Sequence, residues 1–334
     1  MMDREKVVLV TDYAWPNLEP EREIFSQARA RILLAETGAT DELVALAPQA
    51  DAILCNWKPV PASVLKAASH CVAIGRYGIG LDNIDVRTAT ELGMIVTNVP
   101  AYCIDDVADH AMALLLACNR KVCWFDRDIK AGRYELQAHT PLHRLRGHTL
   151  GLAGFGRIGR AVAQRALAFG LLVIALKPRV LQARATDGVK FVDFSELLEQ
   201  SDYLSLHLPA TPETVNLFRR ESLQRMKQGA VLINTSRGSL LDQEDLLWAL
   251  ETGKIAAAGI DVWRQEPVPH DDWLALHPRV IATPHAAFYS HESLLELQTT
   301  AALQIVAILE GRMPENVVNA QVLKNENLRA YLSP

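Results

Sequence analysis

Short apolar runs alternate with amphipathic stretches along most of the chain, which is the pattern of strands separated by helices. Four runs of strand length occur early, at 7–10, 52–55, 72–75 and 95–97. Amphipathic segments at 21–36 and 62–68 predict helices between them. Short β-branched strands that alternate with helices favour a parallel sheet covered on both faces.

A second series of strands and helices occupies the later part of the chain. Its predicted strands are 150–153, 172–176, 191–192, 203–207, 231–235, 257–261 and 280–282. Seven strands with intervening helices make one complete doubly wound α/β domain. Before this series, a long helix with an acidic first turn is predicted at 105–119, and the polar, aromatic segment 121–147 is interpreted as an arm.

A glycine-rich turn opens the second series. Gly154, Gly156 and Gly159 follow an apolar run, and the alanine-rich segment 160–169 continues as a helix. The first glycine permits a tight turn, the second lets the backbone approach a pyrophosphate, and the third lets the helix pack close to the strand. Because the N-terminus of that helix stabilises negative charge, the sequence predicts a dinucleotide site here.

The position of this turn, almost halfway along the chain, predicts two domains. The last predicted helix, 292–310, has no strand after it and is expected to return to the first domain. We expect two Rossmann-like α/β domains with doubly wound parallel sheets: a dinucleotide-binding domain at 102–287, and a discontinuous, flavodoxin-like substrate-binding domain at 1–101 and 288–334. A ligand is expected in a cleft between two such domains.

Three polar residues follow strands of the second series, where open α/β sheets build their sites. Arg237 can bind a carboxylate through two parallel hydrogen bonds. His285 can exchange a proton with a carbonyl oxygen near neutral pH, and Glu266 can hold that imidazole in one tautomer and keep it protonated. Each residue alone is also typical of a structural ion pair or a turn. Beside a nicotinamide, the three together suit hydride transfer to a 2-oxo acid.

Several motifs together resemble the D-2-hydroxyacid dehydrogenase family over nearly the whole chain. They are GFGRIG at 154–159, TSRG at 235–238, IDV at 260–262 with EP at 266–267, PHAA at 284–287 and GLDNID at 80–85. Segments 74–80 and 285–290 are similar to the branch that contains the C-terminal-binding-protein corepressors and their bacterial dehydrogenase relatives.

The resemblance implies roles for particular residues. His285 would be the acid/base, Glu266 its partner, and Arg237 the ligand of the substrate carboxylate. The implied substrate-binding residues are Arg76, the backbone amides around Tyr77, Gly78 and Ile79, and Phe288, which stands where the branch usually carries Trp and keeps a smaller aromatic wall. The implied cofactor-binding residues are Gly154, Gly156, Arg157, Ile158, Gly159, Leu208, Pro209, Thr214, Thr235, Arg237, Asp261 as the acceptor for the nicotinamide carboxamide, and His285.

The end of the strand after the glycine turn departs from the family pattern. An NAD site uses an acidic residue about 20 residues beyond the last glycine to accept from the ribose hydroxyls. Lys177 stands there instead, with Arg179 two residues on. Lysine has no acceptor but can pair with a phosphate, so we predict that NADP is preferred and that NAD is possible. The alternative is a solvated lysine with NAD bound less tightly.

The loop after the strand 52–55 suggests a hypothesis about which residues select the substrate. Lys58 or Arg76 would meet a second anionic group of the substrate, while Trp57 would pack on its side chain. The alternative is that Lys58 is merely exposed and Trp57 belongs to the core.

Composition narrows the classes of partner. The chain has 334 residues and a net charge of −5, with a pI near 6.1, which argues against nucleic acid and anionic membranes. The charged start of the chain is not a signal peptide, and no apolar run could span a bilayer, so a cytoplasmic location is expected. The five cysteines lack metal-ligand spacing, so free thiols and no metal are expected.

The leading interpretation is an NADP- or NAD-dependent oxidoreductase that interconverts a small 2-oxo acid and a D-2-hydroxy acid. The alternative is a nucleotide-sensing, corepressor-like scaffold with little turnover. The family resemblance also implies a homodimer, with the aromatic arm around Trp124 and Phe125 at the contact.

Overall fold

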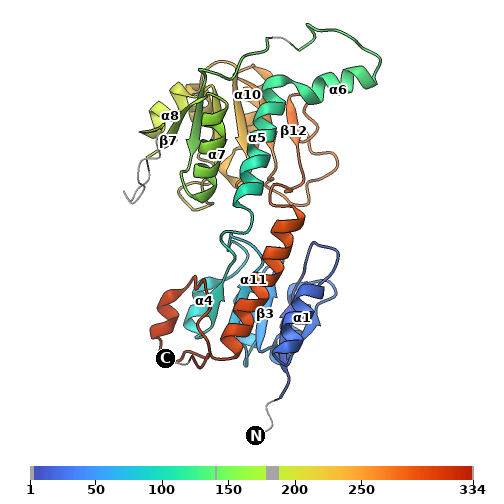
Figure 1. Ribbon diagram of the computed structural model, residues 1–334, viewed down its shortest axis with the longest axis vertical. Coiled ribbons are helices and arrows are strands. Elements are labelled where there is room, and N and C mark those ends of the chain that lie inside the picture. Colours follow the sequence, from blue (N-terminus) through green and yellow to red (C-terminus); the bar gives the residue numbers. More distant parts are fainter. Residues whose placement is uncertain (1–3, 140, 178–187, 333–334) are drawn as a thin grey trace. The chain divides into compact units, whose positions relative to one another are not determined.

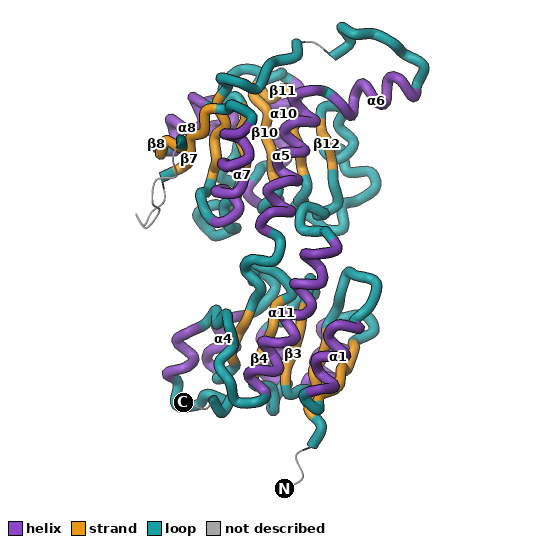
Figure 2. The backbone as a smooth tube through the Cα atoms, in the orientation of Figure 1, coloured by secondary structure: helices purple, strands orange, loops and turns teal. Residues whose placement is uncertain are grey.

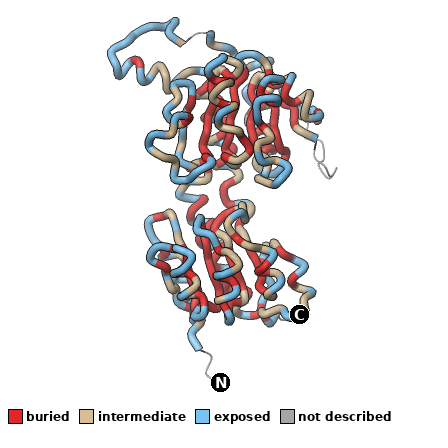
Figure 3. The backbone as a smooth tube through the Cα atoms, turned by 180° about the vertical axis from the view of Figure 1, so that it is seen from behind, coloured by how far each residue is buried: buried red, intermediate tan, exposed pale blue. Residues whose placement is uncertain are grey.

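The computed structural model describes residues 4–139, 141–177 and 188–332. The chain forms two compact units, Met1–Tyr102 with Ser290–Pro334, and Cys103–Tyr289. In both units the strands form the buried interior and the helices lie outside them (Figures 1–3). The first unit is called the split unit below, and the second the continuous unit.

The split unit contains a five-stranded parallel sheet. Its strands are β1 (Lys6–Val10), β2 (Ala30–Leu34), β3 (Ala52–Cys55), β4 (Ala73–Arg76) and β5 (Ile95–Thr97). Their spatial order is β2-β1-β3-β4-β5, the order of flavodoxin-like folds. The helical segments are α1 (Glu19–Gln27), α2 (Thr40–Leu46), η1 (Ala47–Gln49), α3 (Ala62–Ala67), α4 (Val86–Glu91), α11 (His291–Leu309) and η3 (Ala320–Lys324). Helix α11 packs on β3, β4 and α1, so the last helix shares the core of the first hundred residues.

One element of the split unit was predicted wrongly. The segment 21–36 is not a single helix, because α1 ends at Gln27 and the chain continues as the edge strand β2. Arg29 adopts a left-handed backbone conformation with φ 51°, which ends the helical path. The β2 residues then pair with β1 along its whole length. Tertiary pairing with a buried strand therefore overrides the local helical pattern.

The continuous unit contains a seven-stranded parallel sheet. Its strands are β6 (Thr149–Ala153), β7 (Leu172–Leu176), β8 (Val189–Val192), β9 (Tyr203–Leu206), β10 (Ala230–Asn234), β11 (Ile255–Ile260) and β12 (Val280–Ala282). The order is β12-β11-β10-β9-β6-β7-β8. This is the dinucleotide-binding order of a Rossmann fold with one added edge strand. The predicted α/β fold class with two doubly wound parallel sheets is confirmed.

Helices cover both faces of this sheet. They are α5 (Ile104–Arg120), α7 (Arg157–Ala168), α8 (Phe194–Gln200), α9 (Arg220–Arg225) and α10 (Gln243–Glu251), with the short η2 (Gly238–Leu240). Helices α5 and α7 bury one face, and α8 to α10 bury the other. Burial on both faces explains why the strands are nearly uninterrupted apolar runs. The segment interpreted as an arm begins with a helix, α6 (Val122–Lys130), which the weak periodicity did not predict.

Candidate active site

The topology of the continuous unit creates a site between β6 and β9. The strand order reverses direction at this pair, and open α/β sheets bind ligands outside the carboxyl ends of strands at such a switch point. The glycine turn leaves the end of β6, and residues 207–209 leave the end of β9. Both segments therefore lie at the position where a dinucleotide is expected.

The three glycines of the turn serve different purposes. Gly154 has φ +112°, and a Cβ there would lie 2.4 Å from the carbonyl oxygen of His207. A Cβ on Gly159 would lie 2.4 Å from the carbonyl oxygen of Gly154, so this glycine permits close packing of α7. A Cβ on Gly156 would meet no atom within 4 Å. Gly156 therefore leaves open space at the N-terminus of α7, where the backbone can approach a phosphate.

Two further observations fit a dinucleotide. The first turn of α7 contains no acidic residue and begins with Arg157, so the positive end of the helix dipole is not neutralised by its own sequence. The hydroxyl oxygen of Thr235 is buried and has no hydrogen-bond partner among the described residues. Because buried hydroxyls are normally satisfied, this one is available to a ligand.

The loop after β10 places Arg237. Asn234, which is fully buried, accepts from the Ser236 amide at 3.1 Å and donates to the Arg237 carbonyl at 2.9 Å. Arg237 Nη1 donates to the Ser236 carbonyl at 2.7 Å, and the side chain is half-buried. The next residue, Gly238, lies so close to the Trp263 backbone that a Cβ would come within 2.1 Å of its carbonyl carbon. The loop therefore has a fixed course.

His285 and Glu266 form a direct pair. His285 Nδ1 lies 2.7 Å from Glu266 Oε2, and both side chains are about one-third exposed, at 28% and 35%. Glu266 Oε1 accepts from the Trp263 amide at 2.9 Å. His285 adopts a left-handed backbone conformation with φ 53°, unusual for a residue other than glycine. Its ring lies edge-on to Phe288, with 6.1 Å between the ring centroids.

The surroundings of this pair keep the carboxylate ionised. Burial acts to raise the pKa of Glu266, but the hydrogen bond and charge of His285, the Trp263 amide and the charge of Arg237 lower that pKa below its ordinary value of 4.5. The Arg237 guanidinium is therefore close enough to influence the pair electrostatically. An ionised Glu266 accepts from the Nδ1–H of His285 and leaves Nε2 as the nitrogen that faces away from the carboxylate.

Other predicted cofactor residues lie on the loop after β9 and at the end of β7. Thr214 donates its hydroxyl to the Pro209 carbonyl at 2.7 Å, and Ser236 donates to the Leu208 carbonyl at 2.5 Å. The loop after β9 is thus tied both to itself and to the loop of Arg237. Lys177 is exposed at the end of β7, where its amide donates to Val192. Arg179 lies outside the described residues.

Asp261 makes contacts that the sequence did not reveal. Its side chain has no exposed surface, and its oxygens accept from the amides of Ala286 and Ala287 and from the Thr283 hydroxyl. The carboxylate therefore fixes the loop of His285. The contact predicted between Asp261 and a nicotinamide carboxamide stays a prediction.

The split unit places the predicted substrate loop at the end of β4. The amides of Tyr77 and Gly78 donate to the carbonyls of Cys55 at 2.8 Å and Arg76 at 3.0 Å. Within the described residues, only the Ile79 amide of the three predicted donors has no acceptor of its own. Arg76 Nη1 contacts the Tyr77 carbonyl and Asn56 Oδ1.

The neighbouring loop is held by a carboxylate. Asp12 accepts from the amides of Asn56, Trp57 and Lys58 at 2.8–3.2 Å. The Trp57 side chain is 50% exposed, so it does not belong to the core. Lys58 is exposed as well. A contact of either residue with substrate stays a prediction.

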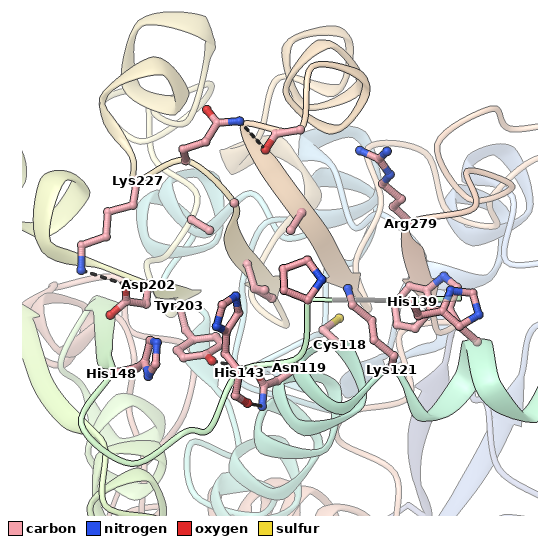
Figure 4. A pocket seen from close by; sticks show the side chains of 18 of the residues that line it. Cys118, Asn119, Lys121, His139, His143, His148, Asp202, Tyr203, Lys227 and Arg279 are labelled. Atoms are coloured by element: carbon pink, nitrogen blue, oxygen red, sulfur yellow. Dashed lines mark hydrogen bonds and ion pairs between the residues drawn. The ribbon is translucent and has the colours of Figure 1, made fainter. Parts of the chain in front are cut away.

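A cavity of about 640 Å³ lies at the amino-terminal ends of the strands of the continuous unit, opposite the glycine turn (Figure 4). Its cations have structural partners. Lys227 pairs with Asp202 at 2.8 Å, Arg279 donates to the Leu250 carbonyl in the last turn of α10 at 2.6 Å, and Lys121 lies 4.8 Å from the Trp124 ring centroid. Because cations are stabilised at the negative ends of helices, the contact of Arg279 with the last turn of α10 stabilises the fold.

The sequence pattern did not identify the residues that hold the loops of Arg237, Glu266 and His285. Asn234, Trp263 and Thr283 hold the three strand-end loops, and His110 contacts Thr283 from α5. A signal for Asn234 and Thr283 was their position at strand ends. The contact of His110 had no local signal, because His110 and Thr283 are 173 residues apart in sequence.

The described residues contain no group of His, Cys, Asp and Glu side chains that could hold a metal ion. Among the described helices, none combines the length and the apolar character needed to cross a bilayer.

Comparison with known proteins agrees with this geometry. Residues 112–287 match the D-isomer-specific 2-hydroxyacid dehydrogenase NAD-binding domain. A glyoxylate reductase of Korarchaeum cryptofilum is 42% identical over 270 residues, which cover 80% of this chain and 81% of that protein. A D-3-phosphoglycerate dehydrogenase of Archaeoglobus fulgidus is 38% identical over 84% of this chain, but the match spans only 53% of that protein.

A solved structure, a glyoxylate reductase from Paecilomyes thermophila, superposes with a TM-score of 0.85 at 30% identity and covers 95% of this chain and 99% of that one. The similarity therefore extends over both units. The chain belongs to the D-isomer-specific 2-hydroxyacid dehydrogenase family and is an NAD(P)-linked oxidoreductase acting between 2-oxo and 2-hydroxy acids.

Proposed function

We propose that this protein reduces a small 2-oxo acid to its D-2-hydroxy acid, with NADPH preferred over NADH. The observation that carries the proposal is the 2.7 Å contact between His285 Nδ1 and Glu266 Oε2 on loops next to that of Arg237. An imidazole, its carboxylate partner and a guanidinium supply the proton and the anion-binding group that reduction of a 2-oxo acid requires.

Each residue has a defined task in this reaction. Arg237 binds the substrate carboxylate through two parallel hydrogen bonds and so orients the adjacent carbonyl. Glu266 accepts from Nδ1 and stabilises the doubly protonated imidazole. His285 then donates the Nε2 proton to the carbonyl oxygen as the alcohol forms. A reduced nicotinamide cofactor held by the glycine turn and Asp261 would supply the hydride.

The substrate we propose is small, of the size of glyoxylate or hydroxypyruvate. Two relatives named glyoxylate reductase match 80% and 87% of this chain and 81% and 87% of their own lengths. The Ile79 amide and Arg76 are proposed as further donors to the carboxylate, and Phe288 as the aromatic contact for the substrate side chain. Asp261, Thr235 and the turn at Gly154 to Gly159 are proposed to hold the cofactor, with Lys177 at the adenosine phosphate.

The test is a panel of 2-oxo acids assayed with NADPH and NADH in parallel. Glyoxylate, hydroxypyruvate, pyruvate and branched 2-oxo acids should separate by kcat/KM, with the smallest acids preferred. The variant H285A should lose turnover by roughly 10²- to 10⁴-fold. Binding of nucleotide without turnover of any acid by the parent protein would instead support the corepressor-like scaffold.

We further propose a cytoplasmic homodimer. The arm exposes apolar side chains that a partner surface could cover, with Val122 58%, Ile129 57%, Tyr134 91% and Leu136 81% exposed. All five cysteines are free thiols, which suits a reducing compartment. Sedimentation of the parent protein and of a variant with L136D and Y134D should show a dimer and a shift toward monomer, respectively.

A further inference from the structure

The loop of His285 is anchored to a single buried carboxylate. Asp261 Oδ1 accepts from the Thr283 hydroxyl at 2.5 Å and from the Ala286 amide at 2.8 Å, and Oδ2 accepts from the Ala287 amide at 3.0 Å. The Asp261 carbonyl accepts from the His285 amide at 2.7 Å. Four donors from residues 283–287 therefore converge on Asp261, and they hold His285 in its left-handed conformation.

The number of protons on each group determines which atoms donate in the hydrogen bonds next to the Asp261 carboxylate. His110 Nε2 lies 3.1 Å from the Thr283 hydroxyl oxygen and 3.6 Å from Asp261 Oδ1. The hydroxyl has one proton, and both side-chain oxygens of Asp261 already accept from backbone amides, so Thr283 donates to Asp261. The hydroxyl oxygen can then only accept from His110. The Nε2 atom of His110 therefore carries a proton, and the chain of donors runs from His110 to Thr283 to Asp261.

Thr283 also connects the two halves of the acid/base pair. Its carbonyl accepts from the indole Nε1 of Trp263 at 3.0 Å. The Trp263 amide in turn donates to Glu266 Oε1 at 2.9 Å. Thr283 thus contacts both Asp261, which anchors the His285 loop, and Trp263, which holds Glu266.

We propose that Thr283 is a positioning residue for hydride transfer. His110 orients the Thr283 hydroxyl toward Asp261. The Asp261 carboxylate in turn holds the His285 loop so that the imidazole stays aligned with Glu266. The proposal rests on the proposed acid/base role of His285. Neither Thr283 nor His110 touches the reacting atoms. Both act through Asp261, because a small displacement of an acid/base group is enough to slow proton transfer.

The first test needs no turnover. Long-range ¹⁵N–¹H correlation spectra of ¹⁵N-histidine-labelled protein distinguish the two imidazole tautomers, and the signals of His110 are assigned as those missing from H110Q. We expect a proton on Nε2 in the protein at neutral pH. An Nε2 without a proton would overturn the proposal, whatever the enzyme reduces.

The second test removes the hydroxyl and keeps the shape. T283V should lower kcat by roughly 10- to 100-fold, and its midpoint of thermal unfolding shows whether the variant is folded. T283S retains the hydroxyl and should stay within about threefold of the parent kcat. Equal kcat values for T283V and T283S would contradict the proposal. If T283V does not fold, H110L compared with H110Q, which keeps an N–H donor, makes the same comparison.

The outcomes separate this inference from the proposed function. If the parent protein reduces no 2-oxo acid, the proposed function fails, and the tautomer of His110 still tests the anchor. If the parent is active and H285A is not, but T283V is as active as T283S, the positioning role alone is refuted.

Discussion

Trp263 and Thr283 join the two loops on which the acid/base pair stands. The Trp263 indole donates to the Thr283 carbonyl at 3.0 Å across 20 residues of sequence. The loop of Glu266 and the loop of His285 are therefore tied to each other by this hydrogen bond as well as by the 2.7 Å contact between their side chains. Preorganisation of this kind lowers the cost of aligning a proton donor.

Glu266 can be tested by removing its charge while keeping its shape. E266Q should lower kcat by roughly 10²-fold or more, because an amide stabilises the protonated imidazole less than a carboxylate does. The pH above which reduction declines should move downward in E266Q. Full pH profiles of kcat/KM for both proteins check this, and superimposable profiles would contradict it.

The same carboxylate links stability to pH. The pKa of Glu266 is lowered in the folded protein, so its contribution to the free energy of unfolding is present above pH 4.5 and is lost as the pH falls through the lower, folded-state value. Unfolding by denaturant at pH 7 and at pH 4 should show a larger loss of stability for the parent than for E266Q. An equal loss in both proteins would rule out this linkage.

Arg237 is expected to act through its geometry and not only through its charge. R237K keeps a cation but cannot form two parallel hydrogen bonds, so KM for the 2-oxo acid should rise by roughly 10- to 100-fold. Unfolding by denaturant serves as the control for the fold of R237K. An unchanged KM in R237K would show that a point charge suffices and that Arg237 does not orient the carboxylate by two bonds.

Gly154 and Gly156 make a matched pair. G154A places a Cβ against the His207 carbonyl at a φ that alanine rarely adopts, and should lower the free energy of unfolding by at least about 2 kcal/mol. G156A meets open space, so its stability should stay within about 1 kcal/mol of the parent. Because the alanine methyl group would occupy the approach of a pyrophosphate, G156A should weaken cofactor binding by roughly tenfold or more.

Thermal or denaturant unfolding, together with fluorescence titration with NADPH, separates the two effects. A variant G156A that binds as tightly as the parent would show that no phosphate approaches this turn.

The preference for NADP depends on Lys177. K177D should favour NADH, with a change of roughly tenfold or more in the ratio of kcat/KM values for the two cofactors. The reason is that an aspartate accepts from the ribose hydroxyls and repels a phosphate. K177A is the control, since it should lose NADPH affinity without gaining NADH affinity. An unchanged ratio in K177D would place the lysine outside the cofactor site.

The local pattern of the sequence was sufficient for most of the fold. Hydrophobic runs predicted all seven strands of the continuous unit, since strands buried on both faces must be apolar throughout. The glycine turn was predictable because a Cβ would collide with backbone at Gly154 and Gly159, and because Gly156 leaves open space at the N-terminus of α7. Strand β2 was not, since its residues become a strand only by pairing with β1.

The candidate site, like the fold, could be predicted only in part from the sequence. Arg237, Glu266 and His285 could be named from residue type and position after a strand, and only folding brings His285 Nδ1 within 2.7 Å of Glu266 Oε2. The contact between His110 on α5 and Thr283, 173 residues later, has no local signal at all. Residue type determines which chemistry is possible. Hydrogen bonds between distant segments decide which of these groups are aligned, because their directions are set only when the sheet has formed.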